Sequence, residues 1–174
     1  MRILKKILLF IAILIAIPLV AAIFMKKDFS SERNITIHKP LTEVFDFVKY
    51  LKNQDQYGVW NLKDPGMKKD YQGIDGTVGF VSMWDSEQWD VGKGTQTITN
   101  IEENARIDTE LRFDGDNTPM YATLLLEPVG ENQTKVSWRV SGTMPYPFNF
   151  MSLFFDIGDD LEQGLKNLKQ VLEK

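Results

Sequence analysis

The sequence predicts an α+β fold in which helices cover one face of an antiparallel sheet, preceded by one transmembrane helix. Three observations lead to this prediction. An uncharged apolar run covers Ile7 to Met25, a period-two pattern covers Met67 to Ser141, and a helical apolar stripe covers Phe148 to Glu173. Because the helical segments come before and after the strands instead of alternating with them, all can be placed on one face of a single sheet.

Size and charge restrict the class of protein. The chain has 174 residues and is 43% hydrophobic, which is enough for one domain with a true core. The absence of cysteine excludes disulfides, thiol chemistry and zinc–thiolate sites. All 24 acidic residues lie at Asp28 or later, so the chain after Lys27 carries a formal charge of −9. Such an acidic domain would repel phosphate backbones, and nucleic acid is not an expected partner.

The apolar run Ile7 to Met25 has two interpretations. As a helix, its 19 residues span about 28 Å, close to the hydrocarbon thickness of a bilayer. A cleaved signal peptide could use Val20-Ala21-Ala22 as its cleavage site. Ile23 to Met25 continue the apolar run past that site, which favours an uncleaved anchor, with the membrane as a partner.

Charges beside the run predict its orientation. Basic residues flank it on both sides: Arg2, Lys5 and Lys6 before it, and Lys26, Lys27 and Arg33 after it. With the terminal amine, the first group is slightly more positive, which places the N-terminus in the cytoplasm and the domain on the non-cytoplasmic side of the membrane. We therefore expect a single-pass membrane protein with an anchor over 1–27, a polar tether over 28–33 and a folded domain over 34–174.

The folded domain is expected to open with a short strand and two helices. Asn34 to Ile37 alternates polar and apolar residues, as a strand does. Pro40 ends this strand and suits the first turn of a helix that runs to about Lys52. A second short helix or turn covers Gln54 to Trp60.

The middle of the chain reads as consecutive strands. The clearest is Arg106–Phe113, where Ile107 and Leu111 share one face while Asp108 and Glu110 share the other. The turns between strands are short, so neighbouring strands must be antiparallel. With the first strand, the predicted sheet has about seven strands, the last six being Asp70–Gln72, Thr77–Trp84, Trp89–Ile101, Arg106–Phe113, Met120–Glu127 and Lys135–Ser141.

The C-terminal stripe predicts one long helix from Phe148 to Glu173. Its apolar residues recur at three- and four-residue steps, so they form one face that must be buried. Gly158 falls within the stripe, where it would leave a gap or a kink. The residues of this face are Met151, Phe154, Phe155, Leu161, Leu165, Leu168 and Leu172.

Short segments in a fixed order from Ile35 to the C-terminus carry a resemblance to a known family. They are Ile37-His38-Lys39-Pro40 with Val44-Phe45-Asp46-Phe47, Trp60-Asn61, Asp64-Pro65-Gly66-Met67, Gly76-Thr77-Val78-Gly79, Val91-Gly92-Lys93-Gly94, Leu126-Glu127-Pro128-Val129-Gly130, Thr134-Lys135-Val136-Ser137-Trp138, Gly142-Thr143-Met144-Pro145 and Gly164-Leu165-Lys166-Asn167-Leu168-Lys169. Taken together, they resemble the START-like or Bet v 1-like superfamily, specifically its bacterial polyketide cyclase/dehydrase branch, also labelled SRPBCC.

The resemblance implies a helix-grip fold, in which a curved antiparallel sheet wraps around a long C-terminal helix. It also implies an elongated apolar cavity between the sheet and that helix. Proteins of this family bind lipids, sterols, polyketides and other apolar molecules, and some catalyse cyclisation or dehydration. A shared fold does not fix the function, so these remain expectations.

Residues with catalytic or metal-binding potential are sparse, and we expect no cofactor, no metal and no catalytic constellation. His38 is the single histidine and sits at a strand-to-helix junction, where a surface or capping role is expected. Asp114 to Asn117 lacks the spacing of a calcium loop. Gly92 to Thr95 lacks the upstream glycine of a phosphate-binding loop.

Two groups of carboxylates remain. Asp108 and Glu110 share a strand face opposite the apolar one, where a solvated role is expected. Asp85, Glu87 and Asp90 lie in a loop next to two tryptophans. That loop is either a gate or polar anchor at the mouth of a cavity, or an exposed hairpin tip.

Aromatic and large apolar residues concentrate in the predicted layer between helix and sheet. Each could be ordinary core, but a pocket with few polar groups would hold an apolar ligand through buried area alone. The residues expected to bind such a ligand are Trp60, Phe80, Trp84, Trp89, Leu111, Tyr121, Trp138, Met151, Phe154 and Phe155.

Three functions remain open at this stage. The first is membrane-anchored binding of an apolar small molecule or lipid. The second is a cyclase/dehydrase-type enzyme, which would need a buried acid facing the cavity and would be hard to defend if Glu87, Asp90 and Tyr121 all faced solvent. The third is an interaction module whose pocket is filled by its own side chains, which a cavity below roughly 300 Å³ would favour.

Overall fold

The computed structural model describes residues 2–115, 118–153 and 157–174. The chain forms two compact units. One consists of Met1–Phe29 with Thr143–Asp156, and the other of Ser30–Gly142 with Ile157–Lys174.

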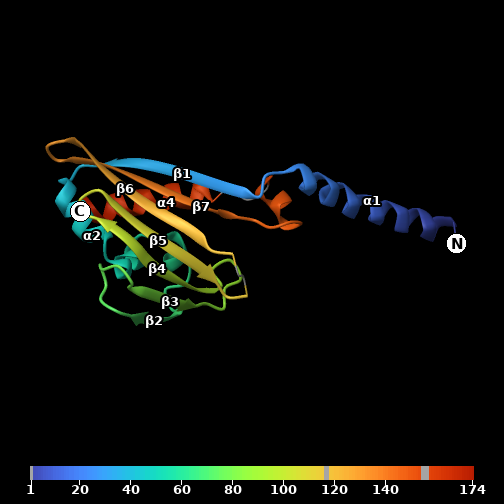
Figure 1. The fold of residues 1–174 in the computed structure, drawn as a ribbon, viewed down its shortest axis with the longest axis horizontal. Helices are drawn as coiled ribbons and strands as arrows, with labels where there is room; N and C mark the ends of the chain where they lie inside the picture. The colour runs from blue at the N-terminus through green and yellow to red at the C-terminus, as the bar shows by residue number, and fades with distance from the viewer. Residues whose placement is uncertain (1, 116–117, 154–156) are drawn as a thin grey trace. The chain divides into compact units, whose positions relative to one another are not determined.

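A seven-stranded antiparallel sheet is the main element, which confirms the predicted fold class (Figure 1). The strand order is β1-β7-β6-β5-β4-β3-β2. Consecutive strands from β2 to β7 are therefore neighbours in the sheet, and β1 lies beside β7 at one edge. The strands are β1 Asp28–Ile37, β2 Lys68–Gln72, β3 Val81–Asp85, β4 Lys93–Glu102, β5 Arg106–Phe113, β6 Met120–Gly130 and β7 Gln133–Thr143.

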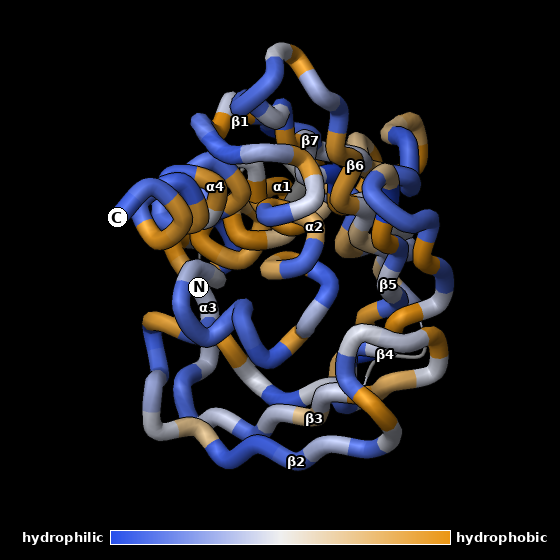
Figure 2. The backbone as a smooth tube through the Cα atoms, turned by 90° about the vertical axis from the view of Figure 1, so that its left-hand side faces the viewer, coloured by the Kyte–Doolittle hydropathy of each residue, from blue (hydrophilic) through white to orange (hydrophobic). Residues whose placement is uncertain are grey.

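The helices of the larger unit lie on the concave side of the sheet. Figure 2 shows the sheet curving from β7 through β4 to β2, with α3 and α4 inside the curve. The helical elements of the chain are α1 Arg2–Phe24, α2 Leu41–Val48, η1 Leu51–Gln56, α3 Val59–Lys63, η2 Phe148–Leu153 and α4 Gly158–Leu172, where η1 and η2 are 3-10 helices.

The packed core lies under α4. Leu161, Leu165 and Leu168 recur at helical spacing, and each is at most 1% exposed. A Cβ on Gly164 would lie 2.8 Å from the ring of Trp138, so only glycine allows the helix to approach β7 this closely. Burial of each leucine contributes about 1.5–3 kcal/mol, and this face of α4 therefore holds the helix against the sheet.

The predicted single helix from Phe148 to Glu173 was wrong. The chain instead forms η2, and α4 begins only at Gly158. Gly158 is thus the first residue of α4 and not a gap within it. The side chain of Arg33 occupies the space where a Cβ at this position would lie, so the helix starts where a residue without a side chain lets β1 come close.

The polar tether predicted over 28–33 was also wrong, because β1 already begins at Asp28. Every second residue of β1 is at least partly covered. Several of these are polar, including Ser31 and Arg33, so the period-two pattern was not visible as hydrophobic alternation. Glu32 accepts a hydrogen bond from Nε of Arg139 on β7 (2.6 Å).

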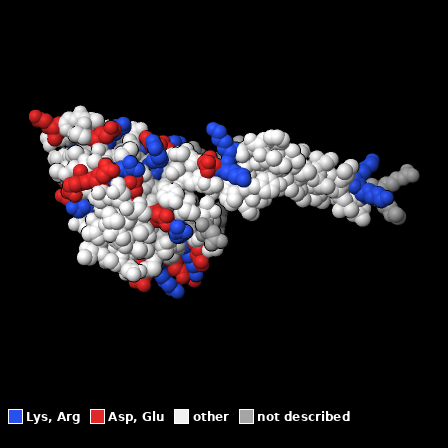
Figure 3. Space-filling model, in the orientation of Figure 1, with Lys and Arg blue, Asp and Glu red and all other residues white. Residues whose placement is uncertain are grey.

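The smaller unit contains α1, which matches the predicted apolar run. Within its segment Ile3–Phe24, a stretch of 18 residues has a mean hydropathy of 3.2 and is 6% buried, so the helix is long and apolar enough to cross a membrane. Figure 3 shows the surface of α1 without acidic or basic side chains between its two ends. A signal sequence has the same properties, and the helix alone does not distinguish the two.

Candidate functional site

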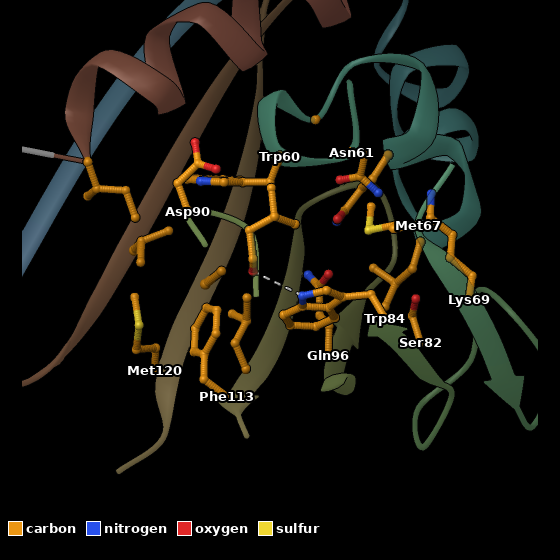
Figure 4. Close-up of a pocket in the computed structure, with 18 of the residues that line it drawn as sticks. Trp60, Asn61, Met67, Lys69, Ser82, Trp84, Asp90, Gln96, Phe113 and Met120 are labelled. Atoms are coloured by element: carbon orange, nitrogen blue, oxygen red, sulfur yellow. Dashed lines mark hydrogen bonds between the residues drawn. The ribbon is translucent and has the colours of Figure 1, made fainter. Parts of the chain in front are cut away.

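A cavity of about 180 Å³ opens between the concave face of the sheet and the short helices η1 and α3 (Figure 4). Strands β2 to β7 all contribute to its wall. It lies at the end of the concave face that the buried leucines of α4 do not fill. The residues that line it include Leu51, Gln54, Trp60, Asn61, Met67, Lys69, Ser82, Trp84, Asp90, Val91, Gln96, Leu111, Phe113, Met120, Ala122, Trp138, Val140 and Ile157.

Strand register builds the floor of the cavity. Gln96 on β4 pairs with Leu111 on β5, and Leu111 pairs with Met120 on β6. Ser82 on β3 pairs with Gln96 from the other side. Directly paired residues share a face of the sheet, so these four side chains form one row across four strands. The period-two pattern therefore aims them all into the same space.

A second row carries the aromatic part of the wall. Gly94 on β4 pairs with both Trp84 on β3 and Phe113 on β5. A Cβ on Gly94 would lie 2.7 Å from the Trp84 ring, so the glycine makes room for the indole to lie across the strand. The Trp84 and Phe113 rings meet edge to face with centroids 5.6 Å apart. The indole nitrogen donates to the Val91 carbonyl at 3.3 Å, which fixes the ring at the cavity wall.

Residues from α3 cover the opposite side. In Figure 4, Trp60 and Asn61 lie across the cavity from Phe113 and Met120. The helix α3 has only five residues and no buried side chain, so it covers the sheet less completely than α4 does. The space beneath α3 is consequently not filled by the described side chains.

Two glutamines lie where the cavity meets a smaller, mostly apolar recess. This recess of about 10 Å³ shares Gln54 and Gln96 with the main cavity and adds Thr109. The Gln96 amide donates to the Thr109 hydroxyl at 3.1 Å, which leaves its carbonyl oxygen as an acceptor at the wall. The Tyr57 side chain is fully buried with its hydroxyl close to Gln54, but it does not line the cavity. Burial raises the pKa of Tyr57, which keeps this group a neutral phenol.

An ion-paired rim joins three elements at the mouth. Lys63 at the end of α3 lies 3.2 Å from Asp90 in the β3–β4 loop and 3.9 Å from Asp160 on α4. The Ser86 hydroxyl donates to Asp64 at 2.5 Å and anchors the same loop. These contacts hold the loop against the helices, and opening them would widen the entrance.

The carboxylates on the convex face form a separate network. Asp108 accepts hydrogen bonds from Thr123 Oγ1 (2.6 Å), Arg106 Nε (2.9 Å) and Asn100 Nδ2 (3.1 Å). Partial burial favours the protonated acid, but these bonds outweigh it and lower the pKa of Asp108. The network belongs to the outer surface of the sheet, where the Asp108 side chain is 17% exposed.

His38 has a surface role. Its backbone N–H donates to Glu173 at 2.6 Å, and its ring nitrogen Nδ1 lies 3.0 Å from the same carboxylate. The backbone bond from His38 is the main cause that lowers the pKa of Glu173. The pair connects the end of β1 to the end of α4 and does not line the cavity.

The structure brings together only part of the predicted ligand-binding set. Trp60, Trp84, Leu111 and Trp138 line the cavity. Phe80 is 1% exposed and packs with Leu51 and Ile98 as core. Trp89 is 89% exposed and Tyr121 is 49% exposed, so neither lines the wall. Phe154, Phe155 and the side chain of Met151 lie outside the described residues.

The misplaced residues have physical explanations. Trp89 was expected near the start of a strand, but β4 begins at Lys93, after a loop that leaves the ring in solvent. Tyr121 pairs with Glu110 on β5, and this pair lies on the convex face. Of the groups that the enzyme hypothesis would need, Glu87 and Asp90 are both exposed residues. Asp90 is the one that reaches the cavity, and there it is paired with Lys63.

Several lining residues were not among the predicted ligand contacts. Phe113 and Met120 could have been included, because they continue the rows of Trp84 and Leu111. The polar residues Gln54 and Gln96 gave no sequence signal, since glutamine is ordinarily exposed. Their position at the inner wall follows from strand register and helix packing, which single-sequence patterns do not specify.

Comparison with solved structures identifies the fold. Norcoclaurine synthase from Thalictrum flavum, in a complex with a transition-state analogue, superposes with a TM-score of 0.65 and 11% identity over 85% of this chain and 96% of that one. The protein CV1439 from Chromobacterium violaceum gives 0.58 and 17% identity over 83% and 98%. Ara h 8.0201 gives 0.56 and 14% identity over 84% and 98%.

Sequence comparison adds no family assignment, because no family model and no curated protein matches the chain. At these identities, the structural likeness bears on the fold alone. The curved seven-stranded sheet, its helices and these neighbours agree: the chain has the helix-grip fold of Bet v 1-like proteins.

Proposed function

We propose that this protein is a membrane-anchored binding protein that holds a small apolar molecule in the cavity beneath α3. The observation that carries the proposal is the cavity itself, in which two paired rows of side chains from β3 to β6 face a space left open by a short helix. Core positions in a sheet are normally filled by the covering helix. Here, apolar and aromatic side chains line an unfilled volume instead.

The volume limits the ligand. About 180 Å³ lies below the roughly 300 Å³ at which clefts for drug-sized ligands begin. It is nevertheless similar to the roughly 150 Å³ apolar cavity that suffices for benzene. The ligand, or the part of it that enters, is therefore about the size of one aromatic ring or a short alkyl chain. A longer molecule such as a lipid would have to displace the rim.

The two glutamines of the wall, Gln54 and Gln96, select a feature of the ligand. The Gln96 carbonyl oxygen can accept a hydrogen bond from a hydroxyl group, and Gln54 adds a second carboxamide. A ligand with an apolar body and one hydroxyl could pack against the apolar side chains and donate a hydrogen bond to a glutamine. Such a hydrogen bond contributes about 1 kcal/mol, or about a fivefold difference in affinity.

Membrane anchoring is supported by α1. Within Ile3–Phe24, the most apolar stretch of 18 residues is 6% buried, so the described chain leaves it almost entirely uncovered. A bilayer would cover it, and the basic residues at both ends would reach the headgroups. The charge difference between the ends favours a domain on the non-cytoplasmic side. An anchor would keep the cavity next to the bilayer, where apolar molecules partition.

The binding experiment compares p-cresol with toluene, which differ by one hydroxyl. We expect the full-length chain in detergent to bind both and to prefer p-cresol about fivefold by titration calorimetry. Gln96→Leu should abolish this preference, while the matched change Gln72→Leu, at an exposed position of β2, should keep it. Binding of neither probe, together with no co-purifying hydrophobe in native mass spectrometry, would refute the proposal.

A second arm separates a small apolar ligand from a lipid. Ala122 is 6% exposed and lines the cavity, so Ala122→Phe should fill it and lower toluene affinity about tenfold. A fluorescent fatty acid that binds unchanged to the filled variant would place lipid binding elsewhere. A fatty acid that competes with toluene would extend the proposed ligand class to lipids.

The cavity volume also favours a second candidate, an interaction module with a self-filled pocket. In that case neither probe would bind, and Ala122→Phe would overpack the domain and lower its stability. The enzyme hypothesis draws less support from the site. Of its three candidate groups, Tyr121 and Glu87 are exposed, and Asp90 is paired at the rim.

A further inference from the structure

The end of α1 is closed by a segment distant in sequence. The last turn of a helix leaves backbone carbonyls without helical partners, and such groups are costly next to an apolar medium. The Asn149 side-chain amide donates to the Ala22 carbonyl at 2.7 Å and to the Met25 carbonyl at 3.2 Å. Asn149 is fully buried, and Ala22 is 1% exposed. Asn149 therefore caps the helix from a site 127 residues away.

Two further contacts hold the same segment, Thr143 to Phe150, which we call the collar. The Met144 N–H donates to the Lys27 carbonyl at 2.8 Å, and the Thr143 hydroxyl donates to Asp28 at 2.8 Å. The collar is thus bonded to the chain at three successive points, starting inside the last turn of α1. Its position relative to the end of α1 is fixed by these bonds.

The collar exposes apolar and aromatic side chains while carrying no charge of its own. Tyr146 is 47% exposed and Phe148 is 57% exposed. Phe24, the last residue of α1, is 85% exposed. Lys26 and Lys27 follow after Met25 and are also exposed. Aromatic side chains next to lysines, at the end of a membrane helix, are the composition that favours the boundary between headgroups and acyl chains.

We propose that the collar lies in this boundary layer of the bilayer, where Tyr146 and Phe148 contact lipid and Asn149 caps the membrane helix. This inference rests on the proposed anchoring by α1. The occupant of the exposed aromatic surface is the bilayer around α1, because that surface continues directly from the apolar helix through the bonded end at Ala22. The collar also requires that α1 be retained, since cleavage after Ala22 would remove a partner of Asn149.

Single-cysteine probes test the placement, because the chain has no cysteine of its own. An environment-sensitive fluorophore is attached to Tyr146→Cys, to Ile13→Cys in α1, or to Ile74→Cys, whose native residue is 75% exposed in the larger unit. The full-length protein is placed in vesicles of phosphatidylethanolamine and phosphatidylglycerol at about three to one. Spin labels on the lipid headgroup or in the middle of the acyl chain then quench the fluorophore.

The collar predicts a distinct pattern for each probe. The Tyr146 probe should lose more fluorescence to the headgroup label, the Ile13 probe more to the mid-chain label, and the Ile74 probe little to either. A Tyr146 probe that behaves like the Ile74 probe, while the Ile13 probe is quenched, would overturn the collar and leave the anchor intact. An unquenched Ile13 probe would overturn both, but would leave ligand binding in the cavity untouched.

The capping role has its own readout. Asn149→Ala should raise amide hydrogen exchange at Ile23 to Lys27 about tenfold in the vesicles, because two hydrogen bonds to the helix end are lost. The control Asn132→Ala, at an exposed turn, should leave these amides unchanged. Unchanged exchange in Asn149→Ala would contradict the cap.

Discussion

The two ends of the concave face use the same sheet in different ways. Under α4, Leu161, Leu165 and Leu168 fill the space completely, and Gly164 lets the helix touch Trp138. Under α3, the paired row that contains Leu111 faces a cavity of about 180 Å³. The difference lies in the covering helix, because α4 has 15 residues and a continuous apolar face whereas α3 has five residues and no buried side chain. The short helix α3 thus leaves a cavity, whereas the long helix α4 builds a packed core.

Shortening a buried leucine of α4 should lower the free energy of unfolding more than any other change considered. Leu165→Ala removes a side chain that is 1% exposed, so we expect a loss of about 3–4 kcal/mol in the free energy of unfolding. All four tryptophans lie in the larger unit, so denaturant titration followed by tryptophan fluorescence reports on this unit alone. A loss below about 1 kcal/mol would mean that the α4 interface is looser than described.

The same truncation in the hollow end should cost less and improve binding. Leu111 is only half-buried and already borders a void, so Leu111→Ala is expected to lower stability by about 1–2 kcal/mol. The enlarged cavity should also bind butylbenzene about tenfold more tightly than the native one. Equal stability losses for Leu111→Ala and Leu165→Ala would remove the distinction between the two ends.

The sequence predicted the packed end better than the hollow one. The strand succession, the buried stripe of α4 and the alternation in β5 all follow from periodicity, and each was found. The start of α4 at Gly158 was not predicted, because the apolar stripe in the sequence does not mark where the helix begins. The cavity could not be predicted in the same way, because its existence depends on the distance between α3 and the sheet, which the hydrophobic pattern does not encode.

A substitution on the convex face of the sheet should change stability the least. The lowered pKa of Asp108 means that its carboxylate is stabilised in the folded state, so its contribution is present above the unfolded pKa of about 3.9 and is lost as pH falls through the lower folded value. We expect this contribution to be about 1 kcal/mol or less. Asp108→Asn should therefore flatten the loss of stability below about pH 4, measured by denaturant titration. An unchanged pH profile would show that the convex network does not act through this carboxylate.

The central claim is that the apolar part of the space beneath α3, beside Leu111, Phe113 and Met120, is a dry binding site, and xenon tests it most directly. Apolar cavities of this size admit xenon, whereas polar ones hold ordered water. Crystals of the protein under xenon pressure should show one xenon atom among Leu111, Phe113 and Met120, and Ala122→Phe should exclude it. Ordered water in that space, or no space between these side chains and α3, would contradict the account.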